Sequence, residues 1–502
     1  MTTNTAKRSL LVLALFVLAT TGVAQEKPTV EQLQKQLEAL RGAFEREQAA
    51  HREQLELLRK QIESLKPGTS SQLSGVVAPP TNGGATNAAS TATAVATAPQ
   101  KTAPPAANTE PAQPATDLTR PIQIGGNGKS YVGLSLDGLF AAGASTASNI
   151  ESLQPGGHDP KQRGFTVQGL EMVLDGAVDP FFRGQANLLF QTDARGESRF
   201  ELEEGYLVST SLPANLQLKA GQYYTEFGRL NPTHPHAWTF VDQPLVNGRF
   251  LGPDGLRNPG ARLSWLLPTP FYSELYLGIQ NSQGETAASF RDDRGGDLLF
   301  GRPVAQGGVA GVGSMLFAPR YAASFDLSDT QTLLMGTSAA FGPNGSGTHT
   351  DTQIYGVDWF WKWKSPHHDG GFPFVSWQTE GMLRNYDAGS YNGLRDPANP
   401  TVALPAETLL DYGFYSQVAW GFRKGWVTAL RGDYVAGNTA ALTPDPDRLS
   451  RWRVSPNLTW YPSEYSKIRV QYNYDQRDTI GPDHSLWLQM EFLLGSHAAH
   501  QF

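Results

Sequence analysis

The segment His234-Pro235-His236 is the most suggestive candidate for metal chemistry in this chain of 502 residues. On an extended backbone, side chains two positions apart point to the same side, so the two imidazoles could approach one cation. A Zn²⁺ or Cu²⁺ site needs three or four ligands, and this pair provides two. Packing of a loop or lining of a water-filled space explains the pair more simply, so the expectation is that the chain holds no metal and no cofactor.

Two other histidine pairs are weaker candidates. His497 and His500 are three positions apart, which on a strand directs them to opposite faces. His367-His368 stands beside Asp369 in a predicted turn, where solvated side chains are the ordinary outcome. Neither pair therefore predicts a shared site.

The adjacent carboxylates Glu203-Glu204 are the sort of pair that could suggest an acid–base assignment. On a regular strand they face opposite sides, so a β-bulge or lining of a lumen is the simpler explanation. The sequence contains no Ser-His-Asp set, no glycine-rich phosphate loop and no His-Glu-x-x-His motif. An enzyme such as a barrel lipase or protease is therefore not expected.

Composition divides the chain near residue 120. All 11 Trp and all 17 Tyr lie after that point, so only the later part can build a large apolar surface. There is no Cys, which excludes disulfides and thiolate metal ligands. The net charge of −7, without a concentrated Lys/Arg surface, argues against a nucleic-acid partner.

The charged residues after 120 occur within segments of strict alternation. In residues 468–475, Ile, Val and two Tyr occupy one face, while Arg, Gln, Asn and Asp occupy the other. Segments 182–193 and 355–364 alternate in the same way. A strand with one apolar and one polar face is typical of a membrane-spanning barrel, whose outer face meets lipid and whose inner face meets water.

Counting such segments predicts an all-β fold, an antiparallel transmembrane β-barrel of about sixteen strands, and bacterial barrels have even strand numbers. The predicted strands are 130–145, 162–178, 181–195, 199–211, 216–228, 259–268, 272–284, 315–327, 330–342, 351–364, 373–386, 408–423, 426–437, 448–461, 465–477 and 484–495. The even connections are mostly tight and the odd ones include nearly all the long loops, as such barrels require. The exceptions are a short third connection at 196–198 and a longer even one at 365–372. A soluble β-sandwich or jelly roll is disfavoured because it has no reason to sort its loops this way.

The segment 218–228, Leu-Lys-Ala-Gly-Gln-Tyr-Tyr-Thr-Glu-Phe-Gly, follows Glu203-Glu204-Gly205-Tyr206 and precedes a long loop with Asp242-Gln243-Pro244-Leu245-Val246. This part of the chain, about 180–270, resembles the phosphate-selective porin family (O and P type) of trimeric sixteen-stranded barrels. The resemblance implies a general or anion-preferring pore whose third long loop folds inward. The alternating last strand with the terminal Phe502 also resembles the signal read by the barrel assembly machinery, which implies that machinery as a partner.

The predicted lumen-facing residues depart from that family because acidic and basic side chains are mixed, so the pattern does not predict phosphate selectivity. They are Arg183, Glu201, Glu203, Lys219, Asp358, Lys362, Glu380, Arg384, Asp411, Arg431, Asp433, Arg453 and Arg469.

The long loop 229–258 is predicted to fold into the lumen and set a constriction. Its side chains at 238, 240, 245, 246, 250 and 251 are too apolar for a loop in water, and four prolines stiffen its path. The polar residues expected to face the remaining passage are Arg229, His234, His236, Asp242, Arg249 and Asp254. The alternative is a loop that caps the barrel or packs at a subunit interface.

Residues 1–24 predict a signal peptide with cleavage after Ala24, in preference to a membrane anchor, because the apolar run is short. Residues 25–66 predict a periplasmic coiled-coil helix, favoured over a lone amphipathic helix, and a trimer is the preferred state. Residues 67–120 are rich in Ala, Pro and Thr and predict a disordered linker. Residues 121–502 form the predicted barrel.

These observations predict a porin-like channel in the bacterial outer membrane that lets small hydrophilic solutes or ions diffuse, in contact with outer-membrane lipid. The main alternative is a structural anchor that links the outer membrane to the cell wall through 25–120. A metal-linked outer-membrane protein is a further alternative. A receptor with a plug domain is disfavoured because such barrels have about 22 strands.

Overall fold

The computed structural model describes residues 122–126, 130–193, 196–291, 298–305, 307–393, 403–438 and 448–495. The chain divides into two compact units, Met1–Ala107 and Asn108–Phe502, and every described residue belongs to the second. The predicted signal peptide, coiled coil and linker, together with His497, His500 and Phe502, lie outside the described residues. Among the described residues, no helix is both long enough and apolar enough to span a membrane.

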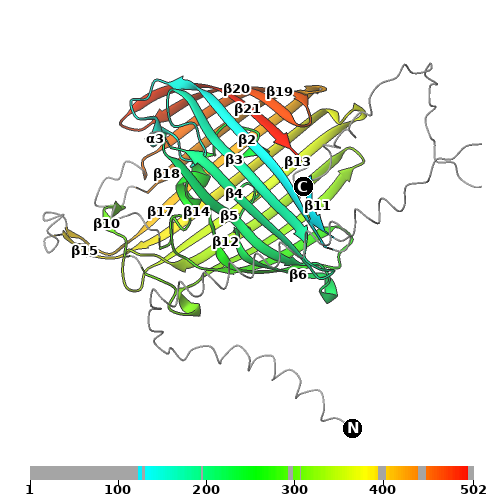
Figure 1. The fold of residues 1–502 in the computed structure, drawn as a ribbon. Helices are drawn as coiled ribbons and strands as arrows, with labels where there is room; N and C mark the ends of the chain where they lie inside the picture. Colours follow the sequence, from blue (N-terminus) through cyan, green and yellow to red (C-terminus); the bar gives the residue numbers. More distant parts are fainter. Residues whose placement is uncertain are drawn as a thin grey trace, which may run out of the picture. The chain divides into compact units, whose positions relative to one another are not determined.

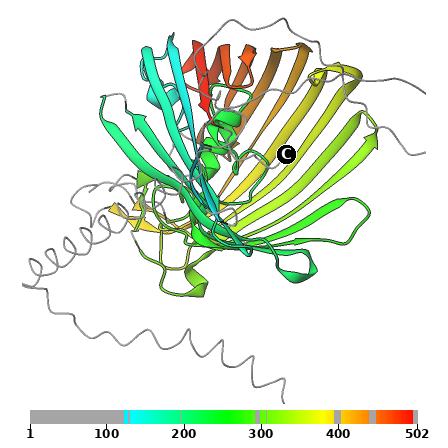
Figure 2. The same cartoon turned by 45° about the vertical axis from the view of Figure 1, so that its right-hand side comes forward.

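The described residues form a closed antiparallel barrel of sixteen strands (Figures 1 and 2). Each strand pairs with its neighbours in sequence order, and the last strand closes the ring on the first through the register Leu136↔Leu494 to Ser145↔Ser485. The predicted fold class and strand number are therefore confirmed. The wall strands are β2 (Tyr131–Ser145), β3 (Gly164–Ala177), β4 (Phe182–Thr192), β5 (Ser198–Ser209), β6 (Leu216–Tyr224), β7 (Arg257–Leu266), β8 (Tyr272–Gln280), β11 (Leu316–Ser328), β12 (Gln331–Pro343), β13 (Asp351–Asp369), β14 (Phe372–Ala388), β17 (Glu407–Arg423), β18 (Trp426–Gly437), β19 (Arg451–Ser463), β20 (Ser466–Arg477) and β21 (Gly481–Leu494).

The remaining elements are short and lie beside the wall strands or in the connections between them. Strand β1 (Ile122–Gly126) pairs with β2 from Tyr131 to Leu134. Strand β21 pairs with the same edge of β2 from Leu136 onward, so β1 continues the pairing along this edge. The remaining short elements are α3 (Ile150–Leu153), η1 (Pro213–Asn215), η2 (Pro235–Ala237), α4 (Leu245–Leu251), β9 (Leu298–Leu299), β10 (Arg302–Pro303), η3 (Val312–Ser314), β15 (Tyr391–Asn392) and β16 (Ala403–Leu404).

The polarity of the wall is inverted relative to a soluble protein. In β20, Val470 and Tyr472 point outward and are 46 % and 38 % exposed, whereas Gln471 and Asn473 point inward and are 0 % exposed. Aliphatic and aromatic side chains cover the outside in the same way on the other strands. Such an outer surface is stable only against hydrocarbon, because it would be a large exposed apolar patch in water.

Aromatic pairs lie on the outside near both ends of the strands. Trp426 and Trp460 stack at 5.9 Å between ring centroids where β18 begins and β19 ends. Trp452 and Tyr474 form a tilted pair at 5.2 Å near the other end of β19 and β20. Two such belts mark the interfaces between lipid and water.

The connections give the barrel two different ends. We call the end with β2's first residue and β21's last residue the turn end, and the opposite end the loop end.

The prediction of a long connection at 365–372 was wrong: β13 continues to Asp369 and pairs it with Phe372. Gly370 and Gly371 both have positive φ (57° and 90°), so they close a two-residue turn that other residues would strain.

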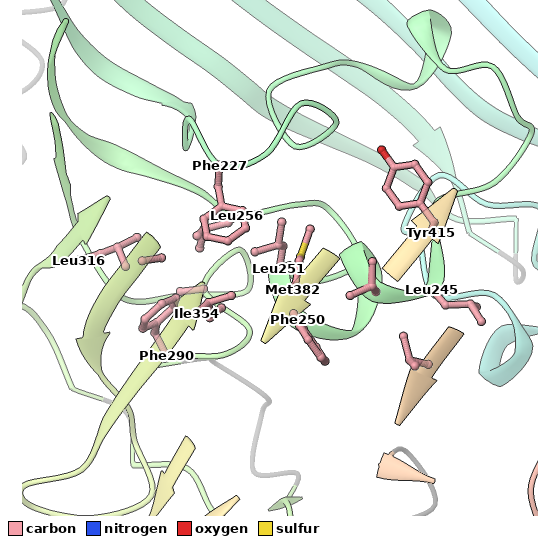
Figure 3. Packing of buried hydrophobic residues seen from close by; sticks show 14 residues of the cluster. Phe227, Leu245, Phe250, Leu251, Leu256, Phe290, Leu316, Ile354, Met382 and Tyr415 are labelled. Atoms are coloured by element: carbon pink, nitrogen blue, oxygen red, sulfur yellow. The ribbon is translucent and has the colours of Figure 1, made fainter. Parts of the chain in front are cut away.

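A long connection, 225–256, which we call the inner loop, leaves the end of β6 and enters the barrel before returning to β7 (Figure 2). Its apolar side chains join inward-facing residues of the wall and two residues of the connection after β8, Ala287 and Phe290, in one buried cluster (Figure 3). The cluster consists of Phe227, Leu245, Val246, Phe250, Leu251, Leu256, Ala287, Phe290, Leu316, Ala340, Ile354, Met382, Tyr415 and Val435. The lumen therefore contains a packed core on the side of β11 to β18.

Candidate functional site

The inner loop begins with backbone hydrogen bonds to the wall. The N–H of Gly228 donates to Ser338 Oγ at 3.0 Å, and the N–H of Leu230 donates to Glu380 Oε1 at 2.7 Å. Between them, the guanidinium of Arg229 lies 4.1 Å from the ring centroid of Phe360. Burial lowers the pKa of Arg229, although Arg remains protonated at any ordinary pH.

Glycines of the wall admit the loop's apolar side chains. A Cβ on Gly356 of β13 would lie 2.8 Å from the ring of Phe227, and one on Gly413 of β17 would lie 3.0 Å from Val246 Cγ2. Helix α4 packs against β14, β17 and β18 in the same region. The loop is therefore fitted to this wall and does not merely hang beside it.

Asp242 attaches the middle of the inner loop to a second part of the wall, formed by β18, β19 and β20. Its Oδ1 accepts hydrogen bonds from Arg431 Nη2 (2.7 Å) and Gln471 Nε2 (2.9 Å). Its Oδ2 accepts from Arg453 Nη1 (2.9 Å) and Asn473 Nδ2 (2.6 Å). Burial alone would raise the pKa of Asp242, but the two guanidinium groups hold it below its ordinary value.

Two histidines of the inner loop contact a third part of the wall, formed by β3 and β5. His234 Nδ1 lies 3.1 Å from Glu203 Oε2, and His234 Nε2 lies 3.0 Å from Glu204 Oε2. His236 Nδ1 lies 3.1 Å from Glu171 Oε2. Burial disfavours a charged imidazole, but the surrounding carboxylates raise the pKa of His234 well above its ordinary value.

Both carboxylates of Glu203-Glu204 point inward because β5 contains a β-bulge. Asn187 of β4 pairs with Glu204 and Leu188 pairs with Leu202, so Glu203 has no partner across the ladder. The expectation that two adjacent side chains face opposite sides fails at a bulge, where two residues oppose one. The bulge was the alternative explanation given for this pair, and it places both carboxylates against His234.

A polar cavity of about 730 Å³ lies on the turn-end side of the inner loop. Lys219, Arg229 and Arg262 line it together with Glu204 and Glu226. Tyrosines complete much of the remaining lining, namely Tyr131, Tyr206, Tyr224, Tyr272 and Tyr276. This space, which we call the vestibule, has a polar lining and is large enough for a small hydrophilic molecule.

The structure does not gather the six polar residues predicted for the loop into one ring. Arg229 and His234 line the vestibule. Arg249 lies toward the loop end, where its Nη1 donates to Leu449 O at 3.2 Å, and Asp254 packs near Gly157. Asp242 is only 1 % exposed, so the expectation that it faces an aqueous passage was wrong: two arginines of the wall bind it first.

The predicted lumen-facing residues lie on the inward faces of their strands, but many do not meet open water. Arg183 and Lys362 are exposed near the turn end, and Glu201 and Lys219 are partly exposed. The others are buried under the inner loop or in ion pairs. Examples are Arg384–Asp411, with 2.6 Å between Nη2 and Oδ2, and Arg431–Asp433, with 2.7 Å between Nε and Oδ2. The buried residues are Glu203, Asp358, Glu380, Arg384, Asp411, Arg431, Asp433, Arg453 and Arg469. Inward-facing charges of opposite sign form charge-assisted hydrogen bonds both within a strand and between neighbouring strands.

Several contacts of the site were not predicted from the sequence, although Glu204 was considered there as the neighbour of Glu203. Glu171 and Glu204 contact the loop histidines, His158 lies beside Glu203, and Arg320 forms an ion pair with Asp358 at 2.6 Å. Strand alternation alone could have found Glu171 and Arg320, which occupy inward positions of β3 and β11. His158 lies in a loop, and no pattern of spacing identifies it.

No family model matches the chain. Among solved structures, the outer membrane channel DcaP of Acinetobacter baumannii is 13% identical with a TM-score of 0.49, covering 74% of this chain and 99% of that chain. The anion-selective porin from Comamonas acidovorans is 8% identical with a TM-score of 0.44, covering 73% and 100%. An uncharacterized protein of Aquifex aeolicus is 30% identical over 403 residues, which cover 74% of this chain and 79% of that protein. The chain belongs to the same protein family as this Aquifex aeolicus protein.

Proposed function

We propose that the protein is a porin-like channel of the bacterial outer membrane, through which small hydrophilic solutes diffuse past the inner loop. The observation that carries the proposal is the placement of the inner loop inside a closed barrel, bonded to three sectors of its wall, with a polar vestibule beside it. A barrel of sixteen strands leaves space for water that a barrel of eight strands does not. The loop then narrows that space without needing a separate plug.

The dense packing of the inner loop supports a narrow passage. The apolar cluster and the Asp242 network together fill much of the lumen between β11 and β20. The remaining polar space borders β4 to β8, where the vestibule lies. We therefore expect passage of single ions or small solutes along this side, with a conductance lower than that of a barrel lacking the loop.

The charges of the vestibule support a preference for small anions. Arg262 forms an ion pair with Glu226, and Lys219 lies 3.8 Å from Glu204, so these charges largely offset one another. Arg183 and Arg229 also line the vestibule together with one further carboxylate, that of Asp175, so positive charge remains in excess. Fixed charges at a narrow point bias which ions enter.

Planar-bilayer recording of the purified full chain tests the proposal. We expect stepwise ion conductance, and we expect a chain lacking residues 233–250 to conduct more and to discriminate less between anions and cations. Folding of both proteins is checked by heat-modifiable mobility on gels. A correctly inserted full-length barrel without conductance would contradict the channel, and an unchanged conductance after the deletion would contradict the constriction.

The role of envelope anchor is the second candidate, and it depends on residues 25–120, which lie outside the described residues. Bilayer recordings on residues 121–502, together with the envelope phenotype of cells that express only these residues, separate the two functions. A channel keeps its conductance without the N-terminal segment, whereas an anchor would lose its envelope phenotype in cells. The self-association of residues 25–66, and with it a trimeric assembly, stays a prediction.

A further inference from the structure

Three imidazoles and three carboxylates meet where the inner loop touches β3 and β5. Their side chains are between 0 % and 10 % exposed, so the group is shielded from bulk water. Its members are His158, Glu171, Glu203, Glu204, His234 and His236. The proposed channel function uses this cluster only as an attachment of the inner loop and assigns it no ligand.

The centre of the cluster has the dimensions of a metal site. Glu171, Glu203 and His234 each offer one ligand atom, and these three atoms lie within 4.8 Å of one another. His234 Nδ1 is 3.1 Å from Glu203 Oε2 and 3.3 Å from Glu171 Oε1. Ligand atoms bound to Zn²⁺ at 2.0–2.2 Å in a tetrahedron are separated by roughly 3.3–3.5 Å, so little movement is needed.

A single proton serves this arrangement less well than a cation. His234 Nδ1 can carry one hydrogen, yet carboxylate oxygens of Glu171 and Glu203 both approach it within hydrogen-bond distance. A divalent cation at the same place would be bound by both carboxylates and by the nitrogen lone pair together. Carboxylate oxygen with imidazole nitrogen, without thiolate, is a ligand set that suits Zn²⁺ and related first-row ions.

The second nitrogen of His234 is oriented as metal-binding histidines require. Its Nε2 lies 3.0 Å from Glu204 Oε2, and Glu204 Oε1 accepts a hydrogen bond from the N–H of Tyr224 at 3.1 Å. Donation from Nε2–H to this fixed carboxylate would leave the Nδ1 lone pair directed at Glu171 and Glu203. Metal-binding histidines almost always donate their second ring N–H to a carboxylate, a backbone carbonyl or water, and Glu204 fills that role here.

His158 provides an independent observation. It is 5 % exposed, and its Nε2 atom makes no hydrogen bond to the described residues, although it lies 3.5 Å from Glu203 Oε1. Its Nδ1 atom lies 3.4 Å from the carbonyl of Gln168, which positions the ring. A buried nitrogen without a hydrogen bond, directed at a carboxylate oxygen, is costly unless a proton or a cation lies between them.

The ring of His236 stacks on that of His234 and restricts its orientation. The two rings are nearly parallel, 12° apart, with centroids separated by 5.7 Å. His236 Nδ1 lies 3.1 Å from Glu171 Oε2, so the same histidine also positions the carboxylate whose other oxygen approaches His234.

We propose that His234 Nδ1, Glu171 and Glu203 bind one divalent transition-metal ion of the Zn²⁺ class, with His158 adjacent as a fourth ligand and Glu204 as a positioning residue. His234 belongs to the inner loop, and both carboxylates belong to the wall, so the ion clamps the loop to β3 and β5. Binding of the ion does not depend on whether the barrel conducts. Only the expected effect on current, a quieter open state when metal is bound, rests on the channel function.

Calorimetric titration of Zn²⁺ into the EDTA-stripped full chain in detergent tests the site without any measurement of current. We expect one equivalent to bind, with an affinity that falls at least about 100-fold in His234→Ala and about 10- to 100-fold in Glu204→Gln. His349→Ala, which removes an exposed imidazole far from the cluster, is the matched control and should bind as the wild type does.

Two results would overturn the site. One is the absence of equimolar Zn²⁺ binding to the folded wild-type chain, which would leave the cluster as imidazolium–carboxylate ion pairs. The other is wild-type affinity in both His234→Ala and Glu171→Gln. If these variants fail to fold, Co²⁺ added to the wild-type chain decides: the intense visible absorption of tetrahedral Co²⁺, displaced by Zn²⁺, supports the site, and the weak spectrum of hydrated Co²⁺ contradicts it.

Discussion

Asp242 of the inner loop and Arg453 of β19 form an ion pair with 2.9 Å between Oδ2 and Nη1, and both side chains are 0 % exposed. The pair joins a loop to a strand more than two hundred positions away in sequence. It belongs to a network in which Arg453 also contacts Asp475 and Arg431 contacts Asp433. Removal of one member would leave buried charge without its counterion.

The first prediction concerns this network. Asp242→Ala should destabilise the seating of the inner loop by about 1–3 kcal/mol, because four donors lose their acceptor while Asp433 and Asp475 still offset part of the charge. We expect a lower heat-modification temperature on gels and more current fluctuation in bilayers. Asp329→Asn, in the exposed turn between β11 and β12, is the control and should change neither. Wild-type behaviour of Asp242→Ala would show that the loop does not depend on this anchor.

The second prediction concerns Arg229. Because this residue adds positive charge to the vestibule, Arg229→Gln should shift the reversal potential in a KCl gradient toward cations. Lys424→Gln removes the same charge at a site that is 65 % exposed in the turn between β17 and β18, and it should have a much smaller effect. Equal shifts in the two variants would place the selective region elsewhere.

The third prediction concerns Gly356, whose missing side chain admits Phe227. Gly356→Ala should cost about 1–3 kcal/mol through overpacking and displace the start of the inner loop. Gly432→Ala is a matched control, because a Cβ on Gly432 of β18 meets no atom within 4 Å. Thermal unfolding of the two variants in detergent provides the comparison. If Gly356→Ala is as stable as Gly432→Ala, the fit between loop and wall is looser than its contacts indicate.

The fourth prediction concerns orientation in the membrane. The chain has no Cys, so single cysteines can be introduced without background. A membrane-impermeant maleimide added to intact cells should label Glu285→Cys in the loop between β8 and β11, and it should not label Ser211→Cys in the turn between β5 and β6. Both sites are exposed, so accessibility to reagent differs only by the side of the membrane. Labelling of Ser211→Cys alone would reverse the orientation.

The sequence by itself determined the wall of this protein. Strand alternation follows from the period of two that an extended backbone imposes, and this local rule located all sixteen strands to within a few residues. The same rule placed Arg431 and Arg469 on the inward face. It failed at residues 365–369, where polar residues extend β13 beyond the apolar segment, and at Glu203, where a bulge interrupts the period.

Only the tertiary structure decided what the inward side chains do. Asp242 was expected to face water, but Arg431 and Arg453 lie close enough to bind it, and nothing in the spacing of these three residues reveals that distance. The meeting of His234 with Glu171 and Glu203 likewise depends on how the inner loop folds across the barrel. Alternation fixes which face a side chain occupies, because that is a local property of the strand. Which side chains meet across the lumen depends on closure of the barrel and on packing of the loop, which no local pattern encodes.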